Sequence, residues 1–277
     1  MDFIGLDALL LSALREDVGT GDITTLSCVP AGNRSDAYLL AKESGVLCGM
    51  DVAARVFALV DGGIVFQPLK KDGETVEKGE TIATVRGPSR SVLTGERVAL
   101  NLLQRLSGIA TATAKAVKSV EGSKARIVDT RKSTPGLRVL EKYAVRCGGG
   151  HNHRFNLADG VLIKDNHIAA AGGITNAVRA ARASVPHVMK IEVETETLAE
   201  VAEALDAGAE IIMLDNMSLK TMAEAVNLIG GKAITEASGN MGEKDLAQVA
   251  RTGVDIISIG ALTHSVRSLD ISLKFKK

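Results

Sequence analysis

The chain has 277 residues, 45% of them hydrophobic, and is long enough to bury one large core or two unequal ones. Lys and Arg total 33, as do Asp and Glu, so no net charge favours nucleic acid or membranes. Aromatic residues are 3% and Trp is absent, which gives little support to stacking on single-stranded nucleic acid. No uncharged apolar run approaches the roughly 18 residues of a membrane span. We expect a globular protein without nucleic-acid or membrane partners.

The N-terminal residues and the cysteines bear on the compartment. Asp2 and Asp7 precede the first basic residue, Arg15, a pattern unlike a secretory signal peptide. The cysteines are odd in number and far apart in the sequence, which fits a reducing compartment better than a disulfide framework. They are Cys28, Cys48 and Cys147. We therefore expect a cytoplasmic protein. Cys147, beside Arg146 and glycines, has the setting of an activated thiolate, but no acyl-transfer triad is readable and we assign it to packing.

The first hundred residues combine one helix with short strands. Apolar residues recur at helical spacing in residues 1–15, from Phe3 to Leu14, before a break at residues 19–22. Short β-type runs separated by glycine-rich turns follow. These runs cover residues 38–41, 45–48, 64–69 and 81–85. The pattern predicts a small sheet domain.

The rest of the chain alternates between strand and helix patterns. Residues 95–120 carry apolar residues at helical spacing and are predicted to link two parts of the protein as one or two helices. The candidate strands are residues 126–129, 160–163, 188–193, 211–214, 233–236 and 256–259. Such alternation implies a parallel sheet. The segment 207–212 recurs as 252–257, as equivalent helix-to-strand units of a barrel would.

Polar residues follow these predicted strands at the edge where barrels of parallel strands build active sites. Between Arg126 and His167 there are eight Lys or Arg against four acids, together with three of the five histidines. Arg binds carboxylates and phosphates with paired hydrogen bonds, and Lys adds a compact charge. We predict a site for a small, multiply charged anion around Arg131, Lys132 and Lys164.

Other features of this edge are less specific. The glycines at 148–150 allow close backbone approach or positive φ, but they also suit an ordinary loop. His151 and His153 lack a third neutral ligand at a recognised spacing, so we expect no structural zinc. Glu194 and Asp215 suit a divalent ion or sugar hydroxyls, with salt bridges to the basic cluster as the alternative.

The ends of the last two predicted strands indicate a phosphate site. Residues 236–240 and 258–261 carry small side chains and unhindered backbone amides. Barrels of parallel strands commonly bind phosphate at this position.

Long motifs carry a resemblance to the quinolinate phosphoribosyltransferase family along the whole chain. They are EDVGTGDIT at residues 16–24, DTRKSTPGLR at 129–138, GGGHNHR at 148–154, LIKDNHI at 162–168 and GALTHS at 260–265. The resemblance implies an α/β fold with an N-terminal α/β sandwich of residues 1–100, joined by about 267–277. Residues 101–266 would then form an irregular, TIM-like parallel α/β barrel of the type II phosphoribosyltransferase kind, which carries the active site.

The same resemblance implies a reaction. A pentosyltransferase of this family (nicotinate-nucleotide diphosphorylase, carboxylating) transfers phosphoribosyl from phosphoribosyl pyrophosphate to quinolinate with decarboxylation. The products are nicotinate mononucleotide, carbon dioxide and pyrophosphate, in de novo NAD biosynthesis. The resemblance also implies Mg²⁺, bound largely through substrate phosphates, and a homodimer or larger homo-oligomer whose active site is shared across the interface.

Site residues are carried over position by position. The catalytic set implied is Lys132, Lys164, Glu194 and Asp215, of which Glu194 and Asp215 hold the Mg²⁺. The quinolinate side takes Arg131, His153, Arg154 and Lys164, with Arg97 contributed by the neighbouring subunit. The phosphoribosyl pyrophosphate side takes Thr130, Lys132, Glu194, Asp215, Ser238, Gly239, Asn240, Ile259, Gly260 and Ala261.

Two alternatives remain open. One is a nicotinate-type phosphoribosyltransferase that does not decarboxylate, whose monocarboxylate substrate needs fewer basic groups. The other is a non-enzymatic homologue associated with molybdate uptake, whose sequences depart around residues 164–167. That stretch and residues 152–154 are intact here.

Overall fold

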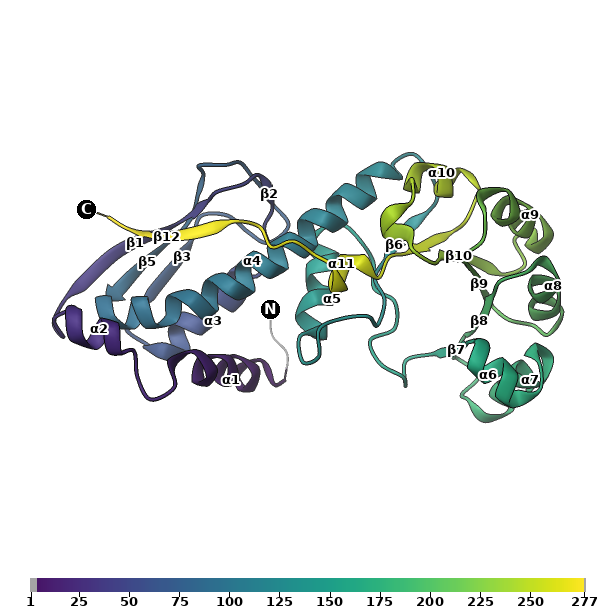
Figure 1. Ribbon diagram of the computed structural model, residues 1–277, viewed down its shortest axis with the longest axis horizontal. Coiled ribbons are helices and arrows are strands. Elements are labelled where there is room, and N and C mark those ends of the chain that lie inside the picture. Colours follow the sequence, from purple (N-terminus) through teal and green to yellow (C-terminus); the bar gives the residue numbers. More distant parts are fainter. Residues whose placement is uncertain (1–3, 277) are drawn as a thin grey trace. The chain divides into compact units, whose positions relative to one another are not determined.

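The computed structural model describes residues 4–276 and divides them into two compact units (Figure 1). The first unit comprises the chain up to Ala112, the segment Arg146–Gly149 and the chain from Val266 onward. The second comprises Thr113–Val145 and Gly150–Ser265. Phe3 and Lys277, which belong to predicted segments, lie outside the described residues.

The boundary between the units lies inside one helix. Helix α4 (Ser89–Ser119) is continuous over 31 residues, so the predicted linker is a single helix rather than two. The sequence analysis places the boundary at residue 100, whereas the units divide between Ala112 and Thr113. The reason is that no proline breaks the helix near residue 100, and Gln104 still contacts the first unit through Ile271, whose carbonyl accepts its side-chain amide at 2.6 Å.

The first unit is built on an antiparallel sheet. Its described elements are α1 (Leu6–Val18), α2 (Ile23–Cys28), β1 (Arg34–Ala41), β2 (Gly45–Val46), α3 (Met50–Val60), β3 (Val65–Pro68), β4 (Thr75–Val76), β5 (Thr81–Pro88) and β12 (Ile271–Phe275). The sheet order is β12-β1-β5-β3, and β2 pairs with β4. Strand β1 buries alternate residues, Ala37, Leu39 and Ala41, as a strand with one covered face does.

Helix α3 is absent from the sequence-based prediction, which assigns only strands between residues 37 and 85. Four of its side chains, Val52, Ala53, Val56 and Phe57, are fully buried and share one face of the helix. A short, almost uniformly apolar run fits a buried strand as well as a buried helix. Packing against the sheet decides between them.

The second unit is built on a parallel sheet. Its described strands are β6 (Arg126–Val128), β7 (Val161–Ile163), β8 (Ile191–Thr195), β9 (Ile211–Asp215), β10 (Ile234–Ser238) and β11 (Ile256–Ser258). Its helices are α5 (Arg138–Cys147), α6 (Asp165–Ala171), α7 (Ile174–Ser184), α8 (Leu198–Asp206), α9 (Leu219–Ile229), α10 (Leu246–Arg251) and α11 (Ala261–His264), with the 3-10 helix η1 (Met241–Glu243). The order β6-β11-β10-β9-β8-β7 leaves β6 and β7 as edges of an irregular, incompletely closed barrel.

Each of the six strands predicted for this half is present. The strand predicted at residues 188–193 begins instead at Ile191, because residues 186–189 form a turn and the Val188 side chain is 76% exposed. Helices α7, α8 and α9 line the outer side of the sheet (Figure 1). Among residues 4–276 no helix combines the length and apolar character that crossing a bilayer would require.

The internal repeat marks two equivalent turns. Gly208 and Gly253 have φ of 85° and 89°, in the left-handed region that favours glycine. The next residues, Ala209 and Val254, are buried at the approach to β9 and β11. The repeat therefore does lead from helix to strand twice, as the sequence predicts.

Candidate active site

A cavity of about 750 Å³ lies at the carboxyl ends of the parallel strands of the second unit. Thirteen of the fifteen predicted site residues line it: Thr130, Arg131, Lys132, His153, Arg154, Lys164, Glu194, Asp215, Ser238, Gly239, Asn240, Gly260 and Ala261. Ile259 does not, since it is 3% exposed and its side chain belongs to the core. Arg97 is exposed on α4 in the first unit and does not line this cavity.

Two guanidinium groups face the cavity close to one another. The positive charge of Arg131 adds to burial in lowering the pKa of Arg154, so the two like charges are neighbours. Arg154 donates through Nη1 to the Gly160 carbonyl at 2.9 Å. The buried Nε of Arg131 has no hydrogen-bond partner among the described residues. An unsatisfied buried donor next to a second guanidinium is an arrangement that an anion would complete.

The ends of neighbouring strands place a lysine and two acids in the same cavity, with the lysine paired to one of them. Lys164, just after β7, donates from Nζ to Glu194 Oε2 on β8 at 2.7 Å. Asp215 ends β9, and its Oδ2 accepts from the Asn216 side chain at 2.7 Å. The alternative of a salt bridge to the basic cluster is therefore realised for Glu194. Both carboxylates still line the cavity.

Beneath the arginines, His153 contacts two buried glutamates. Its Nε2 lies 3.2 Å from Glu192 Oε2 and 3.7 Å from Glu236 Oε2. Its Nδ1 accepts the backbone N–H of Arg154 at 2.8 Å. Both ring nitrogens are thus engaged inside the protein. The His153 ring consequently fixes the backbone from which the Arg154 side chain reaches the cavity.

Glu192 and Glu236 form a buried pair of carboxyl groups that favours binding of one proton. Burial and the charge of Glu192 raise the pKa of Glu236 to about 8. Oε1 of Glu192 and Oε1 of Glu236 are buried and lack hydrogen-bond partners among the described residues. One carboxylate oxygen of each glutamate and a ring nitrogen of His153 lie within 4.8 Å of one another. Two carboxylates this close cannot both be charged cheaply in a buried site, so the pair favours a protonated Glu236.

The charge count made from the sequence needs two corrections. Lys142, counted there as part of the basic cluster, is fully buried and ion-paired with Asp129. It also donates to the His153 carbonyl at 2.9 Å, while Asp129 accepts from the His153 N–H at 2.9 Å and from Asn152 at 2.6 Å. This buried network supports the cavity wall instead of binding substrate.

The second correction concerns acids that the counted window excludes. Four Lys or Arg line the cavity, and so do Glu194, Asp215 and Glu243, together with Glu236, whose raised pKa favours the neutral form. A window of consecutive residues misses acids that other strands bring to the same place. The cavity is therefore divided between cationic and anionic parts, and the local excess of positive charge predicted from the sequence does not extend to its whole lining.

The loops after β9, β10 and β11 close the far side of the cavity. Asn216, Gly239 and Asn240 all have positive φ, of 53°, 88° and 52°. A Cβ atom at Gly239 would lie 2.2 Å from Asn216 Oδ1, so no larger residue fits. At Gly260 a Cβ atom would approach the Lys132 side chain to 3.2 Å. Glycine is required at 239, where φ is positive and a Cβ atom would lie 2.6 Å from the Asn216 backbone nitrogen, whereas at Gly260 only the side chains of Lys132 and His264 would have to move.

The run of three glycines has a different role. Gly149 has a φ of 84° and its N–H donates to the Arg146 carbonyl at 3.0 Å, which ends helix α5. A Cβ atom at Gly150 would lie 2.7 Å from the Thr113 side chain. None of the three glycines lines the cavity. The run ends a helix and lets it pack closely.

Several site residues escape the sequence analysis as site candidates. Glu192 lies within a predicted strand, Glu236 is the last residue of another, and His264 is quoted only inside the GALTHS motif. The signal for Glu192 is its position two residues before Glu194, which places both on the same side of β8. An acid on the buried face of an otherwise apolar strand indicates a functional or paired group.

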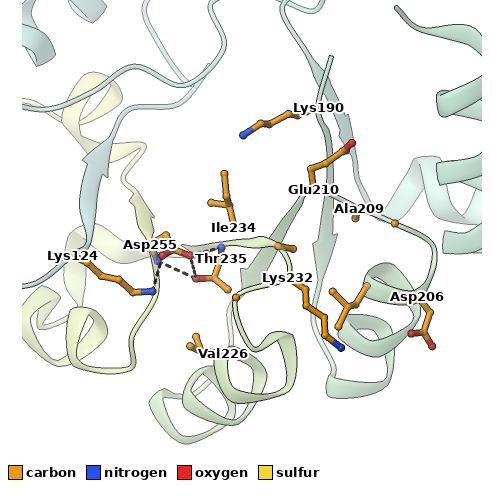
Figure 2. A pocket seen from close by; sticks show the side chains of 14 residues that line it. Lys124, Lys190, Asp206, Ala209, Glu210, Val226, Lys232, Ile234, Thr235 and Asp255 are labelled. Carbon is orange, nitrogen blue, oxygen red and sulfur yellow. Dashed lines mark hydrogen bonds and ion pairs between the residues drawn. The ribbon is translucent and has the colours of Figure 1, made fainter. Parts of the chain in front are cut away.

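A second cavity of about 730 Å³ lies at the opposite, amino ends of the strands (Figure 2). Two of the acids that line it, Asp255 and Glu210, are engaged in ion pairs within the protein. Asp255 accepts from Lys124 at 2.7 Å and from the Thr235 N–H at 2.9 Å, and Glu210 is ion-paired with Arg182. In barrels of parallel strands the amino ends of the strands serve stability, whereas active sites form at the carboxyl ends. The first cavity is therefore the candidate active site.

An α/β barrel with arginines, a lysine and carboxylates around one cavity at the carboxyl ends of its strands defines a class of protein that binds a small polyanion. Two family models match the chain: the quinolinate phosphoribosyl transferase N-terminal domain over residues 22–107 and the C-terminal domain over residues 109–274. The chain belongs to the quinolinate phosphoribosyltransferase family.

Individual relatives agree. The chain is 48% identical over 274 residues to the probable nicotinate-nucleotide pyrophosphorylase (carboxylating) of Bacillus subtilis, covering 99% of this chain and 94% of the relative. It is 44% identical to the chloroplastic enzyme of that name from Arabidopsis thaliana, covering 97% and 82%. The crystal structure of NadC from Streptococcus pyogenes superposes with a TM-score of 0.92 at 46% identity, covering 100% of both chains.

Proposed function

We propose that this chain transfers the phosphoribosyl group of phosphoribosyl pyrophosphate to the ring nitrogen of quinolinate. Loss of carbon dioxide then gives nicotinate mononucleotide, and pyrophosphate is the other product, as in de novo NAD biosynthesis. Family membership over almost the whole chain supports this proposal. The relatives named above are nicotinate-nucleotide pyrophosphorylases.

The arginine pair is the observation that carries the substrate assignment. Arg131 and Arg154 line the same cavity, and the buried Nε of Arg131 has no hydrogen-bond partner in the described part of the chain. A monocarboxylate would satisfy one guanidinium, whereas the two adjacent carboxylates of quinolinate would satisfy both. Lys164 lines the same cavity and adds a third cationic group.

The chain's own residues act mainly by positioning and charge. Arg131, Arg154 and Lys164 orient the quinolinate ring so that its nitrogen faces the ribose carbon that loses pyrophosphate. Positive charge develops on the ribose as that bond breaks, and the carboxylates of Glu194 and Asp215 in the same cavity stabilise it. The positive nitrogen of the pyridinium formed by the attack then stabilises the carbanion that remains on the neighbouring ring carbon when carbon dioxide departs. That carbon takes up a proton to give nicotinate mononucleotide. Fixed groups of this kind contribute several kcal/mol each.

Glu194 and Asp215 are the residues that would hold Mg²⁺. They end adjacent strands, β8 and β9, and offer the carboxylate oxygens that Mg²⁺ prefers, in the cavity that would take the substrate phosphates. The cation would neutralise negative charge on the pyrophosphate. Lys132 lies on the same rim, where its carbonyl accepts from Thr263 at 2.7 Å, and it is suited to contact a phosphate.

The proposal includes a homodimer in which Arg97 of one protomer reaches the active site of the other. Arg97 is exposed on α4 and does not line the cavity of its own chain. An arginine from a partner would add a further cation to the quinolinate side. We place the reaction in the cytoplasm.

The nicotinate-type alternative shares the fold. The crystal structure of human Nicotinic Acid Phosphoribosyltransferase superposes with a TM-score of 0.64 at 13% identity, so the fold by itself cannot separate the two activities. The cavity lining does not support the molybdate-associated alternative, because Lys164, Arg131 and Arg154 are all present in it.

The deciding experiment is an assay of the purified protein with phosphoribosyl pyrophosphate, Mg²⁺ and either quinolinate or nicotinate. We expect nicotinate mononucleotide from quinolinate, with one carbon dioxide released per product. Formation of product from nicotinate would move the assignment to the non-decarboxylating alternative. Absence of product from both would favour the non-enzymatic one.

A further inference from the structure

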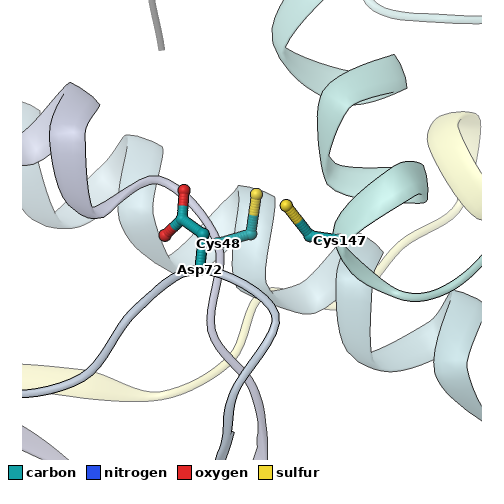
Figure 3. Close-up of side chains that lie close together, drawn as sticks. All are labelled: Cys48, Asp72 and Cys147. Carbon is teal, nitrogen blue, oxygen red and sulfur yellow. The ribbon is translucent and has the colours of Figure 1, made fainter.

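Two cysteines that are far apart in the sequence meet in the first unit (Figure 3). Cys48 follows β2, Cys147 ends α5, and their sulfur atoms point toward one another. Both sulfurs and a carboxylate oxygen of Asp72 lie within 4.8 Å of one another. The sequence analysis treats these cysteines as unclustered, and the tertiary structure corrects that interpretation.

The backbone around this thiol pair is firmly held. Ser107 Oγ accepts from the Cys48 N–H at 3.0 Å and donates to the Cys48 carbonyl at 3.2 Å. Asp72 Oδ1 accepts from the N–H groups of Gly49 and Met50, at 2.9 Å and 3.0 Å, at the start of α3. These contacts keep Cys48 facing Cys147 in the folded protein.

The two thiols differ in access and acidity. Cys48 is buried and Cys147 is partly exposed. Burial raises the pKa of the Cys48 thiol, and its contacts with Cys147 and the charge of Asp72 act in the same direction. Cys48 is therefore poorly suited to meet an oxidant first, whereas it is placed to react with an oxidised Cys147.

We propose that Cys48 and Cys147 form a modification site that hydrogen peroxide converts into an intramolecular disulfide. The Cys147 sulfur attacks the peroxide O–O bond, giving a sulfenic acid and one water. The Cys48 sulfur then attacks the sulfenic sulfur, the S–O bond breaks, and a second water leaves with the Cys48 thiol proton. Peroxide accepts both electrons, and a dithiol reductant reverses the change.

The bond would join the loop after β2 to the end of α5. It would close a chain segment of roughly 100 residues, which restricts the unfolded chain and should raise the melting temperature. Helix α5 also carries Lys142, whose side chain supports His153 in the cavity wall. The disulfide would thus anchor the end of a helix that supports the candidate active site.

The test uses the full chain with Cys28→Ser, which removes an exposed thiol that could cross-link two molecules. After treatment with hydrogen peroxide we expect a mass loss of about 2 Da, the two thiol hydrogens. Both thiols should become unreactive toward a thiol reagent under denaturing conditions, and dithiothreitol should restore both. Peptide mapping without reductant should recover the Cys48 and Cys147 peptides linked, and the oxidised protein should melt at a higher temperature.

Matched controls are Cys48→Ala and Cys147→Ser in the same background. The first should gain oxygen at Cys147 without losing mass, and the second, at a partly exposed position, should leave Cys48 reduced. The proposal is overturned if the Cys28→Ser chain only gains oxygen, or if both thiols persist at a peroxide dose that oxidises Cys28 in the wild-type chain.

Discussion

At the residue scale, the cavity depends on a few groups whose partners are incomplete within the chain. Among residues 4–276, the buried Nε of Arg131 and one buried oxygen each of Glu192 and Glu236 have no hydrogen-bond partner. Buried polar atoms are normally satisfied, so these exceptions at and beside the cavity indicate where a ligand or proton completes the structure. Strong effects on activity are therefore expected from single side chains.

Removal of one cationic group should reduce activity without unfolding the protein. We expect Arg131→Ala and Lys164→Ala to lower kcat/KM by roughly 100- to 1000-fold, the usual effect of losing one preorganised electrostatic contact. Arg131→Lys should recover little, because an ammonium cannot make the paired hydrogen bonds of a guanidinium. Steady-state kinetics with circular dichroism as the folding control would measure this. Near wild-type turnover in either alanine variant would remove that residue from the site.

Glu236 should make stability depend on pH. Its pKa in the folded protein is about 8, above the ordinary value of 4.5, because of burial and Glu192, with His153, Ser258 and Lys164 acting against these. The protonated form is favoured by folding, so this contribution is full below pH 4.5 and is lost as pH rises to about 8. Glu236→Gln should flatten the dependence in that window.

The measurement is urea unfolding at several pH values, in which we expect the two proteins to diverge by about 1–3 kcal/mol across the window. Glu243→Gln, at an exposed position lining the same cavity, is the matched control. If the unfolding free energies of the wild type and Glu236→Gln change with pH in the same way, Glu236 does not take up a proton on folding in this window.

At the scale of elements, an aspartate links two of the parallel strands, β10 and β11, at their amino ends. Asp255, just before β11, accepts from the N–H and the hydroxyl of Thr235 at 2.9 Å and 2.8 Å and from Lys124 at 2.7 Å. Burial opposes ionisation, but these partners prevail and lower the pKa of Asp255. Ionised Asp255 therefore stabilises the folded protein at pH values above the ordinary aspartate pKa of 3.8, and this stabilisation is lost as the pH falls through the lowered pKa of the folded state.

Replacement of Asp255 should destabilise the second unit more than loss of its lysine partner. We expect Asp255→Ala to cost about 1.5–3 kcal/mol in unfolding free energy, since hydrogen bonds to a charged acceptor disappear. Lys124→Ala should cost less than about 1 kcal/mol, because that ion pair is largely exposed. Equal losses in chemical denaturation would show that the ion pair, rather than the strand contact, provides the stability.

At the scale of the whole molecule, the proposed dimer makes a distinct prediction. Arg97→Ala and Lys164→Ala should each be nearly inactive alone, because each site would need Arg97 from one protomer and Lys164 from the other. Mixing the unfolded variants and refolding them together should restore about a quarter of wild-type activity, since half of the dimers are mixed and each holds one intact site. No recovery in the mixture would contradict a shared site.

The sequence by itself determined the order of strands and helices in the second unit and most of the cavity lining. Hydrophobic alternation is a local property, and parallel strands bring their carboxyl ends together, so residues such as Arg131, Lys164 and Asp215 could be assigned to one edge. The long motifs also predicted membership of the quinolinate phosphoribosyltransferase family. The sequence repeat also predicted the two equivalent helix-to-strand turns at Gly208 and Gly253.

Only the tertiary structure decided which charges are available and which are neutralised. In the sequence Lys142 cannot be distinguished from the other basic residues of its cluster, yet it is buried and ion-paired with Asp129, so its role is structural. Helix α3 and the meeting of Cys48 with Cys147 likewise depend on packing between segments that local pattern does not relate. The physical reason is that burial, desolvation and contact are properties of the folded arrangement, whereas periodicity and motif are properties of the chain.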